Sequence, residues 1–249
     1  MSENFVVHPK YEPLAKKLYA VLQDFHSKGE YITKGERNVI KRIGIEGNSL
    51  NIKKFKTPST LQSLVYRFIR KSKAKRSFEY ASKLIGLGIK TPFPVAYLEG
   101  FSGGLKDSFY VSEHIDYDFD FRELIHNPTF KKRNEILRQF ARFTFRLHEN
   151  GINFLDHSPG NTLIIEREQG AFDFYLIDLN RMRFEEMTFE KRMHNFRRLW
   201  LSKTMVKIMA AEYAKLYGKS YEETHALMLK HSRAFQKKIN SKKLRRRKR

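Results

Sequence analysis

An aspartate and an asparagine five residues apart have the spacing of a catalytic loop for phosphoryl transfer. Asp156 and Asn161 belong to segment 154–161, which follows an expected helix and precedes an expected hairpin, so one turn presents both side chains. Asp178 ends an apolar run, where a carboxylate is well placed to bind a metal ion. Because phosphoryl transfer depends on positioning and on neutralising phosphate charge, this set predicts phosphotransfer chemistry.

A lysine and a glutamate upstream complete that set. Lys53 lies on the third expected strand of a small sheet, and Glu79 lies on the helix that follows. A Lys–Glu ion pair in this arrangement orients the phosphates of ATP. The upstream part of the chain is therefore expected to bind the nucleotide.

The elements that must position these residues form a small antiparallel sheet with one helix. Segment 31–56 reads as three short strands broken by turn residues, and apolar side chains recur at helical spacing over 73–88. Segments 94–98 and 108–115, separated by a turn at 102–104, read as a hairpin that returns to the sheet. The expectation is a lobe of five strands and one helix.

The character of the chain becomes mainly helical after residue 116. An apolar helix face ends at 150–151, two strands follow over 162–165 and 172–177, and the chain reads as helical from Phe189. The fold class expected is α+β with two lobes. The expected domains are an N-lobe with an N-terminal helical extension, a helical C-lobe and a basic tail, covering residues 1–115, 116–236 and 237–249.

Over about 31–199 the chain resembles the protein-kinase-like superfamily and, within it, the bacterial lipopolysaccharide kinase family. That family phosphorylates 3-deoxy-D-manno-octulosonic acid (Kdo) or heptose of the inner core. The resemblance rests on several short segments taken together: 37–41, 72–79, 147–151, 156–161, 177–178 and 195–199. It implies a bilobal protein-kinase-like fold.

The resemblance also implies a role for each site residue. Asp156 accepts or orients the proton of the acceptor hydroxyl, while Asn161 and Asp178 hold Mg²⁺ on the phosphates of ATP. Lys53 contacts the α and β phosphates, and Glu79 holds Lys53 in place. Such groups neutralise the charge on the transferring phosphoryl group without a covalent intermediate.

The sequence departs from the protein-kinase pattern at the nucleotide loop and around Asp156. The loop has one glycine, Gly35, as the expected phosphate-binding glycine, and backbone groups of Glu113 to Ile115 are expected to bond adenine. Phe154 and Leu155 precede Asp156 where protein kinases have His-Arg. With no Ala-Pro-Glu motif and no Gly after Asp178, the chain does not read as a regulated protein kinase.

Other interpretations of these residues remain open. Only one of Lys53 and Lys54 can face the nucleotide, because strand neighbours point to opposite faces; the resemblance favours Lys53. Asp156 could instead cap a turn, Asn161 could bond its own loop, and Asp178 could pair with an arginine at 181 or 183. We interpret His148 as structural, and we expect His157, beside the base, to touch the substrate.

Composition narrows the partners and the compartment. The 249 residues carry a net charge of +22, and the nine basic residues of segment 237–249 account for less than half of it. Zero cysteines exclude disulfides, thiolate metal sites and a cysteine nucleophile. The first nine residues lack a signal pattern, and no apolar stretch approaches a membrane span. We expect a cytoplasmic protein.

These observations together predict an ATP- and Mg²⁺-dependent sugar kinase, with the 4-hydroxyl of Kdo on lipid A as the acceptor implied by the resemblance. Segment 237–249 and the basic cluster at 67–76 would dock the enzyme peripherally on the anionic inner face of the inner membrane. One alternative is a kinase for another acceptor: core heptose, a small molecule or a protein. Another is a basic nucleic-acid-binding protein with a vestigial kinase fold, which is disfavoured because no nucleic-acid-reading motif occurs.

Overall fold

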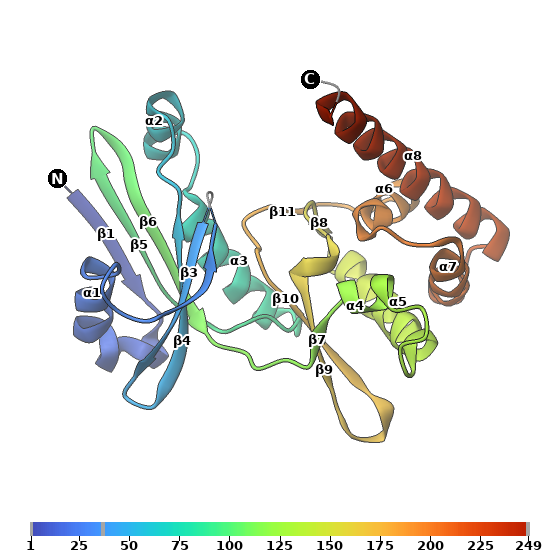
Figure 1. Ribbon diagram of the computed structural model, residues 1–249, viewed down its shortest axis with the longest axis horizontal. Coiled ribbons are helices and arrows are strands. Elements are labelled where there is room, and N and C mark those ends of the chain that lie inside the picture. Colours follow the sequence, from blue (N-terminus) through green and yellow to red (C-terminus); the bar gives the residue numbers. More distant parts are fainter. Residues whose placement is uncertain (1, 36–37, 248–249) are drawn as a thin grey trace. The chain divides into compact units, whose positions relative to one another are not determined.

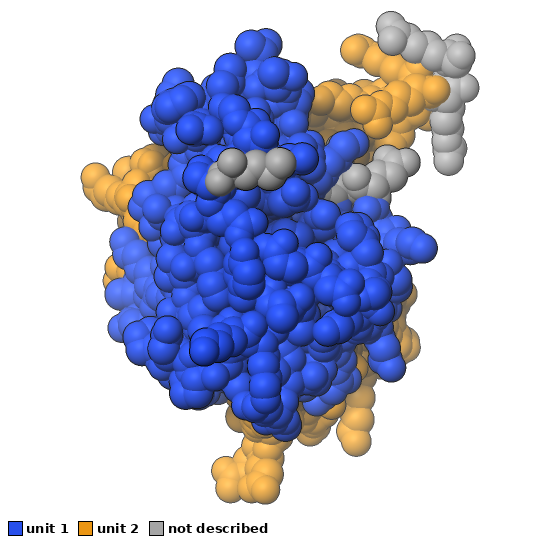
Figure 2. All heavy atoms as spheres, turned by 90° about the vertical axis from the view of Figure 1, so that its left-hand side faces the viewer, with its two compact units in different colours: residues 1–116 blue, residues 117–249 orange. Residues whose placement is uncertain are grey.

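A computed structural model describes residues 2–35 and 38–247, and the chain divides into two units, residues 1–116 and 117–249 (Figures 1 and 2). Unit 1 is built on one antiparallel sheet with helices on both of its faces. Unit 2 is mainly helical and carries two small sheets.

The sheet of unit 1 has six strands in the order β1-β5-β6-β4-β3-β2, and every neighbouring pair is antiparallel. Turns with glycine at positive φ, such as Gly47 and Gly103, join strands that are adjacent in the sequence. The strands are β1 (Ser2–Val7), β2 (Glu30–Lys34), β3 (Asn38–Ile45), β4 (Asn48–Phe55), β5 (Pro94–Ser102) and β6 (Gly104–Glu113). The helices are the 3₁₀ turn η1 (Pro9–Leu14), α1 (Ala15–Gln23), α2 (Thr60–Phe68) and α3 (Lys73–Gly86).

The helices α1 and α3 cover opposite faces of this sheet (Figure 1). Leu50 and Ile52 of β4 pack with Leu18 of α1, whereas Phe55 packs with Ala74 of α3. Successive side chains of a strand point to opposite faces, so the register of β4 assigns each of its residues to one helix. This alternation places Lys53 on the α3 face and Lys54 on the α1 face.

Unit 1 has more elements than the expected five strands and one helix. The sixth strand is β1, which pairs with β5 from Ser2↔Phe101 to Val7↔Ala96. It was missed because its partner is far away in the sequence. The helix α2 was also missed, and the region between β4 and α3 was expected only as a basic cluster.

A buried lysine ties the end of α1 to the sheet. The ammonium of Lys41, on the α1 face of β3, donates to the backbone carbonyls of Phe25, His26 and Lys28 at 2.8–2.9 Å. These carbonyls belong to the turn after α1, where no helical N–H reaches them, so the ammonium satisfies acceptors that regular structure leaves unpaired. Three such bonds offset the cost of burying the charge.

In unit 2 the long helix α5 (Arg133–Glu149) buries one apolar face, and Phe140, Leu147 and their neighbours on it are fully buried. The other helices are α4 (Arg122–His126), α6 (Phe189–Asn195), α7 (Lys203–Tyr217) and α8 (Tyr221–Arg247), with 3₁₀ turns η2 (Pro159–Asn161), η3 (Glu168–Gly170) and η4 (Phe196–Leu199). The strands are β7 (Phe119–Asp120), β8 (Ile152–Phe154), β9 (Thr162–Glu166), β10 (Phe172–Leu176) and β11 (Met182–Phe184), which form the sheets β10-β9-β7 and β11-β8.

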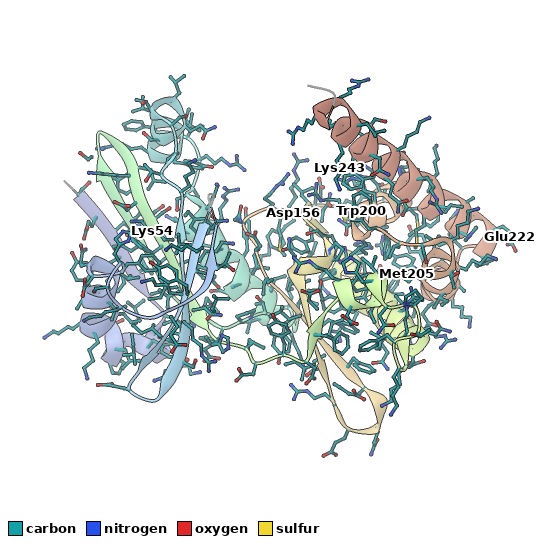
Figure 3. All side chains as sticks on the ribbon, in the orientation of Figure 1. Lys54, Asp156, Trp200, Met205, Glu222 and Lys243 are labelled. Atoms are coloured by element: carbon teal, nitrogen blue, oxygen red, sulfur yellow. The ribbon has the colours of Figure 1, made fainter. Side chains whose placement is uncertain are left out.

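The expected basic tail, residues 237–249, belongs to helix α8 up to residue 247. From Lys237 onward the chain continues α8 without a break, because no glycine or proline follows Gly218 and the tail residues are mostly good helix formers. Lys243 of this part lies over the ring of Trp200, with 5.8 Å between the ammonium and the ring centroid (Figure 3).

Candidate active site

The loop after β8 presents Asp156 and Asn161 as expected. The backbone carbonyl of Asp156 accepts hydrogen bonds from Ser158 N at 2.7 Å and from Asn161 Nδ2 at 2.8 Å. The alternative interpretation of Asn161, that it bonds its own loop, is thus correct for its amide nitrogen. Since Nδ2 is used in this way, the Oδ1 atom is the part of Asn161 that can ligate a cation.

Asp178 lies next to Asn161 because the backbones of the two segments are bonded. Ile177 N donates to Asn161 O at 3.0 Å, and Leu155 N donates to Arg181 O at 3.0 Å. Asp178 has a φ of 58°, in the left-handed region that aspartate tolerates better than most residues. Its carboxylate accepts a bond of 2.5 Å from Asn180 Nδ2. Unit 2 thus gathers Asp156, Asn161 and Asp178 in one place.

Two arginines flank the carboxylate of Asp156, which is labelled in Figure 3. Arg198 Nη2 lies 2.8 Å from Asp156 Oδ1, and Arg181 Nη1 lies 3.6 Å from Oδ2. The side chain of Asp156 is 19% exposed, so a ligand can reach it. Arg181 is one of the two arginines that could have paired with Asp178 in the alternative interpretation, and its observed ion pair is with Asp156.

Arg198 is a site residue that sequence reasoning did not assign. It lies on η4 and also stacks on Phe235 of α8, with 5.5 Å from the guanidinium to the ring centroid. Its Nε is buried and finds no acceptor within the described part of the chain. The segment 195–199 contributed to the family resemblance, but sequence alone gave no sign that Arg198 meets Asp156.

Asn195 holds the loop of Asp156 on both sides. Its Nδ2 donates to the carbonyl of Phe154 at 3.0 Å and to Asn153 Oδ1 at 2.9 Å, and its Oδ1 lies 2.9 Å from His157 Nδ1. Phe154 occupies the position where protein kinases have histidine, and it is buried. Here a side chain from α6 anchors the loop.

The two histidines near the site are interior residues. His148 bonds Tyr213 at 2.7 Å and is fully buried, so its structural interpretation is confirmed. The expectation that His157 touches substrate is wrong, because its ring has no exposed surface. Burial disfavours the charged form and lowers the pKa of His148 to about 3 and that of His157 to about 4. Both are therefore neutral at physiological pH.

In unit 1, Lys53 lies on the face that α3 covers. It is opposite Tyr110, which is opposite Tyr97, and both tyrosines pack with Phe55 and α3. The ammonium of Lys53 lies 5.3 Å from the ring centroid of Phe55. Lys53 therefore shares a face with the helix of Glu79.

Lys54, labelled in Figure 3, lies on the opposite face. Its ammonium is 3.3 Å from both Asp107 Oδ1 and His26 Nε2, and it lies over Phe109. These residues line a cavity of about 230 Å³ beside α1. Lys54 thus points away from α3.

Glu79 belongs to the first half of α3, which Ser72 caps by accepting a bond from Lys75 N at 3.1 Å. Its carboxylate accepts bonds of 2.8 and 2.9 Å from Lys71 Nζ. Burial, with a contribution from the charge of Glu79, raises the pKa of Tyr97. Phe78, the neighbour of Glu79 on α3, packs on Tyr97 with 5.4 Å between the ring centroids, so this turn of α3 lies against the tyrosines beside Lys53.

The expected adenine segment 113–115 is partly engaged within unit 1. The N–H of Glu113 donates to Phe93 O at 2.9 Å, and that of His114 donates to Ser49 O at 2.8 Å. Ile115 is the remaining backbone donor of the segment. The Glu113 carboxylate is bonded by Lys10 and Tyr11, and these bonds outweigh its burial and lower its pKa.

Gly35 lies in the turn between β2 and β3, and its N–H donates to Asn38 O at 3.2 Å. A Cβ atom built there would be 3.4 Å from that oxygen, at the edge of ordinary contact. The backbone therefore does not demand glycine at this position. Residues 36 and 37 of the same expected loop lie outside the described residues.

The donor set in unit 2 suits Mg²⁺. One amide oxygen and one carboxylate, from Asn161 and Asp178, match the few protein oxygens that Mg²⁺ uses when phosphate supplies the rest. Over residues 2–35 and 38–247, no group of three or more His, Cys, Asp or Glu side chains converges as a metal site.

Within the same ranges, no helix is both long and apolar enough to span a bilayer.

Comparisons with known proteins identify relatives of this fold and sequence. The model of the lipopolysaccharide kinase (Kdo/WaaP) family matches residues 52–221. The solved structure of WaaP in complex with acyl carrier protein matches with a TM-score of 0.66 and 17% identity, over 94% of this chain and 98% of the WaaP chain. The MAP kinase LmaMPK10 from Leishmania major gives a TM-score of 0.47 and 15% identity, over 85% of this chain and 64% of that one. No curated protein sequence matched. The expected kinase-like fold is thereby confirmed.

Proposed function

Because the chain belongs to the lipopolysaccharide kinase (Kdo/WaaP) family and is a phosphotransferase with a hydroxyl acceptor, we propose that it phosphorylates the 4-hydroxyl of Kdo on lipid A. Its phosphate donor is ATP, as the kinase family implies. The observation that supports the proposal best is the gathering of Asp156, Asn161 and Asp178 in unit 2, with two arginines at the base.

Asp156 is the proposed catalytic residue. Its carboxylate accepts or orients the proton of the attacking hydroxyl while the loop bonds of Asn195 and Asn161 hold it in place. Asn161 Oδ1 and the Asp178 carboxylate would hold Mg²⁺, which neutralises charge on the transferring phosphoryl group when bound. Each of these residues has a hydrogen-bond partner within unit 2 that fixes its orientation.

Unit 1 is the proposed nucleotide-binding lobe, corresponding to residues 1–115, and residues 116–236 are the proposed catalytic lobe. Lys53 would bind the α and β phosphates and Glu79 would position it, since both belong to the α3 side of the sheet. Ile115 N–H and the carbonyl of Glu113 would bond the adenine edge, and Gly35 would approach the phosphates.

The arginines at Asp156 support an anionic acceptor. The side chain of Arg198 is 28% exposed and that of Arg181 is half exposed, so both arginines remain accessible to a ligand beside Asp156. Guanidinium groups bind carboxylate and phosphate by paired hydrogen bonds. Kdo is a sugar acid whose carboxylate has this chemistry, whereas a neutral sugar acceptor would leave these donors unused.

The proposed place of action is the cytoplasmic face of the inner membrane, where the protein would bind peripherally. The net charge of +22 suits an anionic surface, and each basic residue near such a surface contributes about 1 kcal/mol of attraction. The exposed basic side chains of α8 after Lys237 would take part in this binding.

The test is transfer of phosphate from ATP with Mg²⁺ to purified Kdo-lipid A, read by mass spectrometry. Wild type should add one phosphate, whereas Asp156→Asn and Asp178→Asn should lose the activity and keep their thermal stability. The matched control is Asp173→Asn, since Asp173 is a carboxylate of the same unit that pairs with Arg167. Undiminished transfer by Asp156→Asn would refute its role, and transfer only to heptose-containing acceptors would refute the choice of Kdo.

A further inference from the structure

The helix α2 is mounted on unit 1 by its polar face. Ser63 and Tyr66 are the residues of α2 that are partly buried, whereas the others are exposed. Ser63 lies against β6, since a Cβ atom built on Gly104 would be 2.1 Å from Ser63 Oγ. The guanidinium of Arg67 lies 5.9 Å from the ring centroid of Phe101 on β5. The helix therefore rests on the end of the β5–β6 hairpin (Figure 1).

The apolar face of α2 points away from the protein. Its members follow the spacing i, i+3, i+4, i+7 of one helix face, and none of the residues of α2 is buried. The exposed fractions are 80% for Leu61, 41% for Leu64, 39% for Val65 and 73% for Phe68, and Ile69 directly after the helix is 82% exposed. An amphipathic helix in a folded protein normally has the reverse orientation, with its apolar face inward.

The chain segment that carries this face has a strong excess of positive charge. Segment 56–76 has seven lysines and arginines, and no aspartate or glutamate occurs between Gly47 and Phe78. Arg67 and Arg70 are exposed beside the apolar residues, whereas the nearby Lys71 is paired with Glu79. A large apolar face bordered by cations is the pattern of helices that lie in the interface of an anionic bilayer.

We propose that α2 is a lipid-binding helix that inserts its face of Leu61, Leu64, Val65, Phe68 and Ile69 into the acyl boundary of an anionic membrane. The neighbouring lysines and arginines then bind the lipid phosphates. A second copy of the chain is a poorer occupant, because a two-fold contact through α2 would bring two segments of charge +7 together. This inference goes beyond the proposed reaction, since it requires neither ATP nor a sugar acceptor.

The direct test uses the absence of cysteine from the chain. Phe68→Cys is labelled with the environment-sensitive dye NBD and mixed with vesicles of phosphatidylglycerol and phosphatidylcholine in equal parts, or of phosphatidylcholine alone. The anionic vesicles should shift the emission to the blue and raise its intensity, and quencher-labelled acyl chains should reduce it. The matched control is Leu216→Cys on α7, which is also partly exposed and should not respond.

Flotation with the same vesicles measures how much the apolar face contributes to the affinity for the membrane. The double variant Leu61→Gln/Phe68→Gln should bind anionic vesicles at least about tenfold more weakly, since two large apolar groups no longer leave water. The control pair Ile32→Gln/Leu216→Gln changes exposed apolar residues elsewhere and should bind as wild type does. All of these variants should unfold at the wild-type temperature, because the replaced side chains are exposed.

Three results would overturn the proposal. In the first, the α2 double variant floats as well as wild type, or NBD at position 68 stays in water while the protein floats. In the second, α2 mediates self-association, so that wild type sediments as a dimer and the double variant as a monomer. In the third, α2 binds an acidic protein with saturation and without any vesicle binding. None of these measurements involves phosphotransfer, so failure of the proposed function would leave them interpretable.

Discussion

Arg198 donates a hydrogen bond to Asp156, with 2.8 Å between Nη2 and Oδ1, although η4 and the loop after β8 are far apart in the sequence. An arginine that pairs with the proposed base has two consequences. It fixes the carboxylate, and its side chain keeps 28% exposure, which leaves it accessible to a ligand. We therefore expect Arg198 to act in recognition of the acceptor.

Arg198→Gln should raise KM for the acceptor about tenfold or more, because a hydrogen bond from a charged donor contributes about 1.5–3 kcal/mol. KM for ATP should stay within about twofold, because Arg198 is expected to contact the acceptor and not ATP. Steady-state kinetics with each substrate varied in turn measures both. Arg138→Gln, on an exposed part of α5, is the control; equal acceptor KM values for the two variants would contradict the role.

Lys53→Met and Lys54→Met should separate the two lysines of β4. Lys53→Met should lower kcat about 100-fold or more, because a positioned cation on the phosphates is lost. Lys54→Met should keep kcat within about threefold and cost less than about 1 kcal/mol of stability, since its ion pair with Asp107 is partly exposed. Steady-state kinetics measures kcat of both variants, and chemical denaturation measures their stability. A lower kcat for Lys54→Met than for Lys53→Met would show that Lys54 is the lysine that binds the nucleotide.

Acid should destabilise unit 2 before most carboxylates titrate. The unfolded chain protonates His148 and His157 near pH 6.5, but burial lowers their folded pKa values to about 3 and about 4, so the unfolded state binds more protons between these limits. Stability is complete above pH 6.5 and falls as the pH decreases, by up to about 1.4 kcal/mol per pH unit for each histidine. Urea unfolding followed by the single Trp200, which lies in unit 2, measures it.

The matched variants for that titration are His157→Phe and His126→Gln. The first replaces a ring that packs among Phe140, Phe154 and Phe196, and between pH 6.5 and 4 it should remove about half of the slope that the two buried histidines contribute. The second changes an exposed histidine of α4 and should leave the slope as it is. An unchanged slope in His157→Phe would mean that His157 is protonated in the folded protein.

Lys41→Met should destabilise unit 1 by about 2–4 kcal/mol, because three backbone carbonyls in the turn after α1 lose the buried ammonium that they share as a donor. Methionine keeps most of the volume, so the effect isolates the ammonium. Circular dichroism during chemical denaturation measures the loss. Lys16→Met, at an exposed position of α1, should change stability by less than about 0.5 kcal/mol; comparable losses in both variants would show that the carbonyls do not depend on Lys41.

The contiguous part of the site could be predicted from sequence because local spacing determines it. Asp156 and Asn161 share one turn, and Asp178 lies just after β10, which pairs with β9, the strand after Asn161. The face of Lys53 followed from strand alternation once the register of β4 was known. The roles of these residues in catalysis stay predictions.

Contacts between distant segments could not be predicted in this way. The pairing of β1 with β5 and the meeting of Arg198 with Asp156 depend on tertiary packing, which no periodicity encodes. The orientation of α2 was also inaccessible, since its apolar spacing is that of any amphipathic helix and only the structure shows which face is outward. His157 was misjudged because a residue beside the base can point inward.

Asn195 also determines where the protons of two histidines reside. Its Nδ2 is committed to Asn153 and Phe154, so its Oδ1 can only accept, and both His157 Nδ1 and His148 Nε2 must carry hydrogen. Each ring is thereby fixed as one tautomer, and His148 Nδ1 must accept from the hydroxyl of Tyr213. The donors of this network therefore have fixed directions, so the network is a static frame that supports the loop of Asp156 from the interior of unit 2.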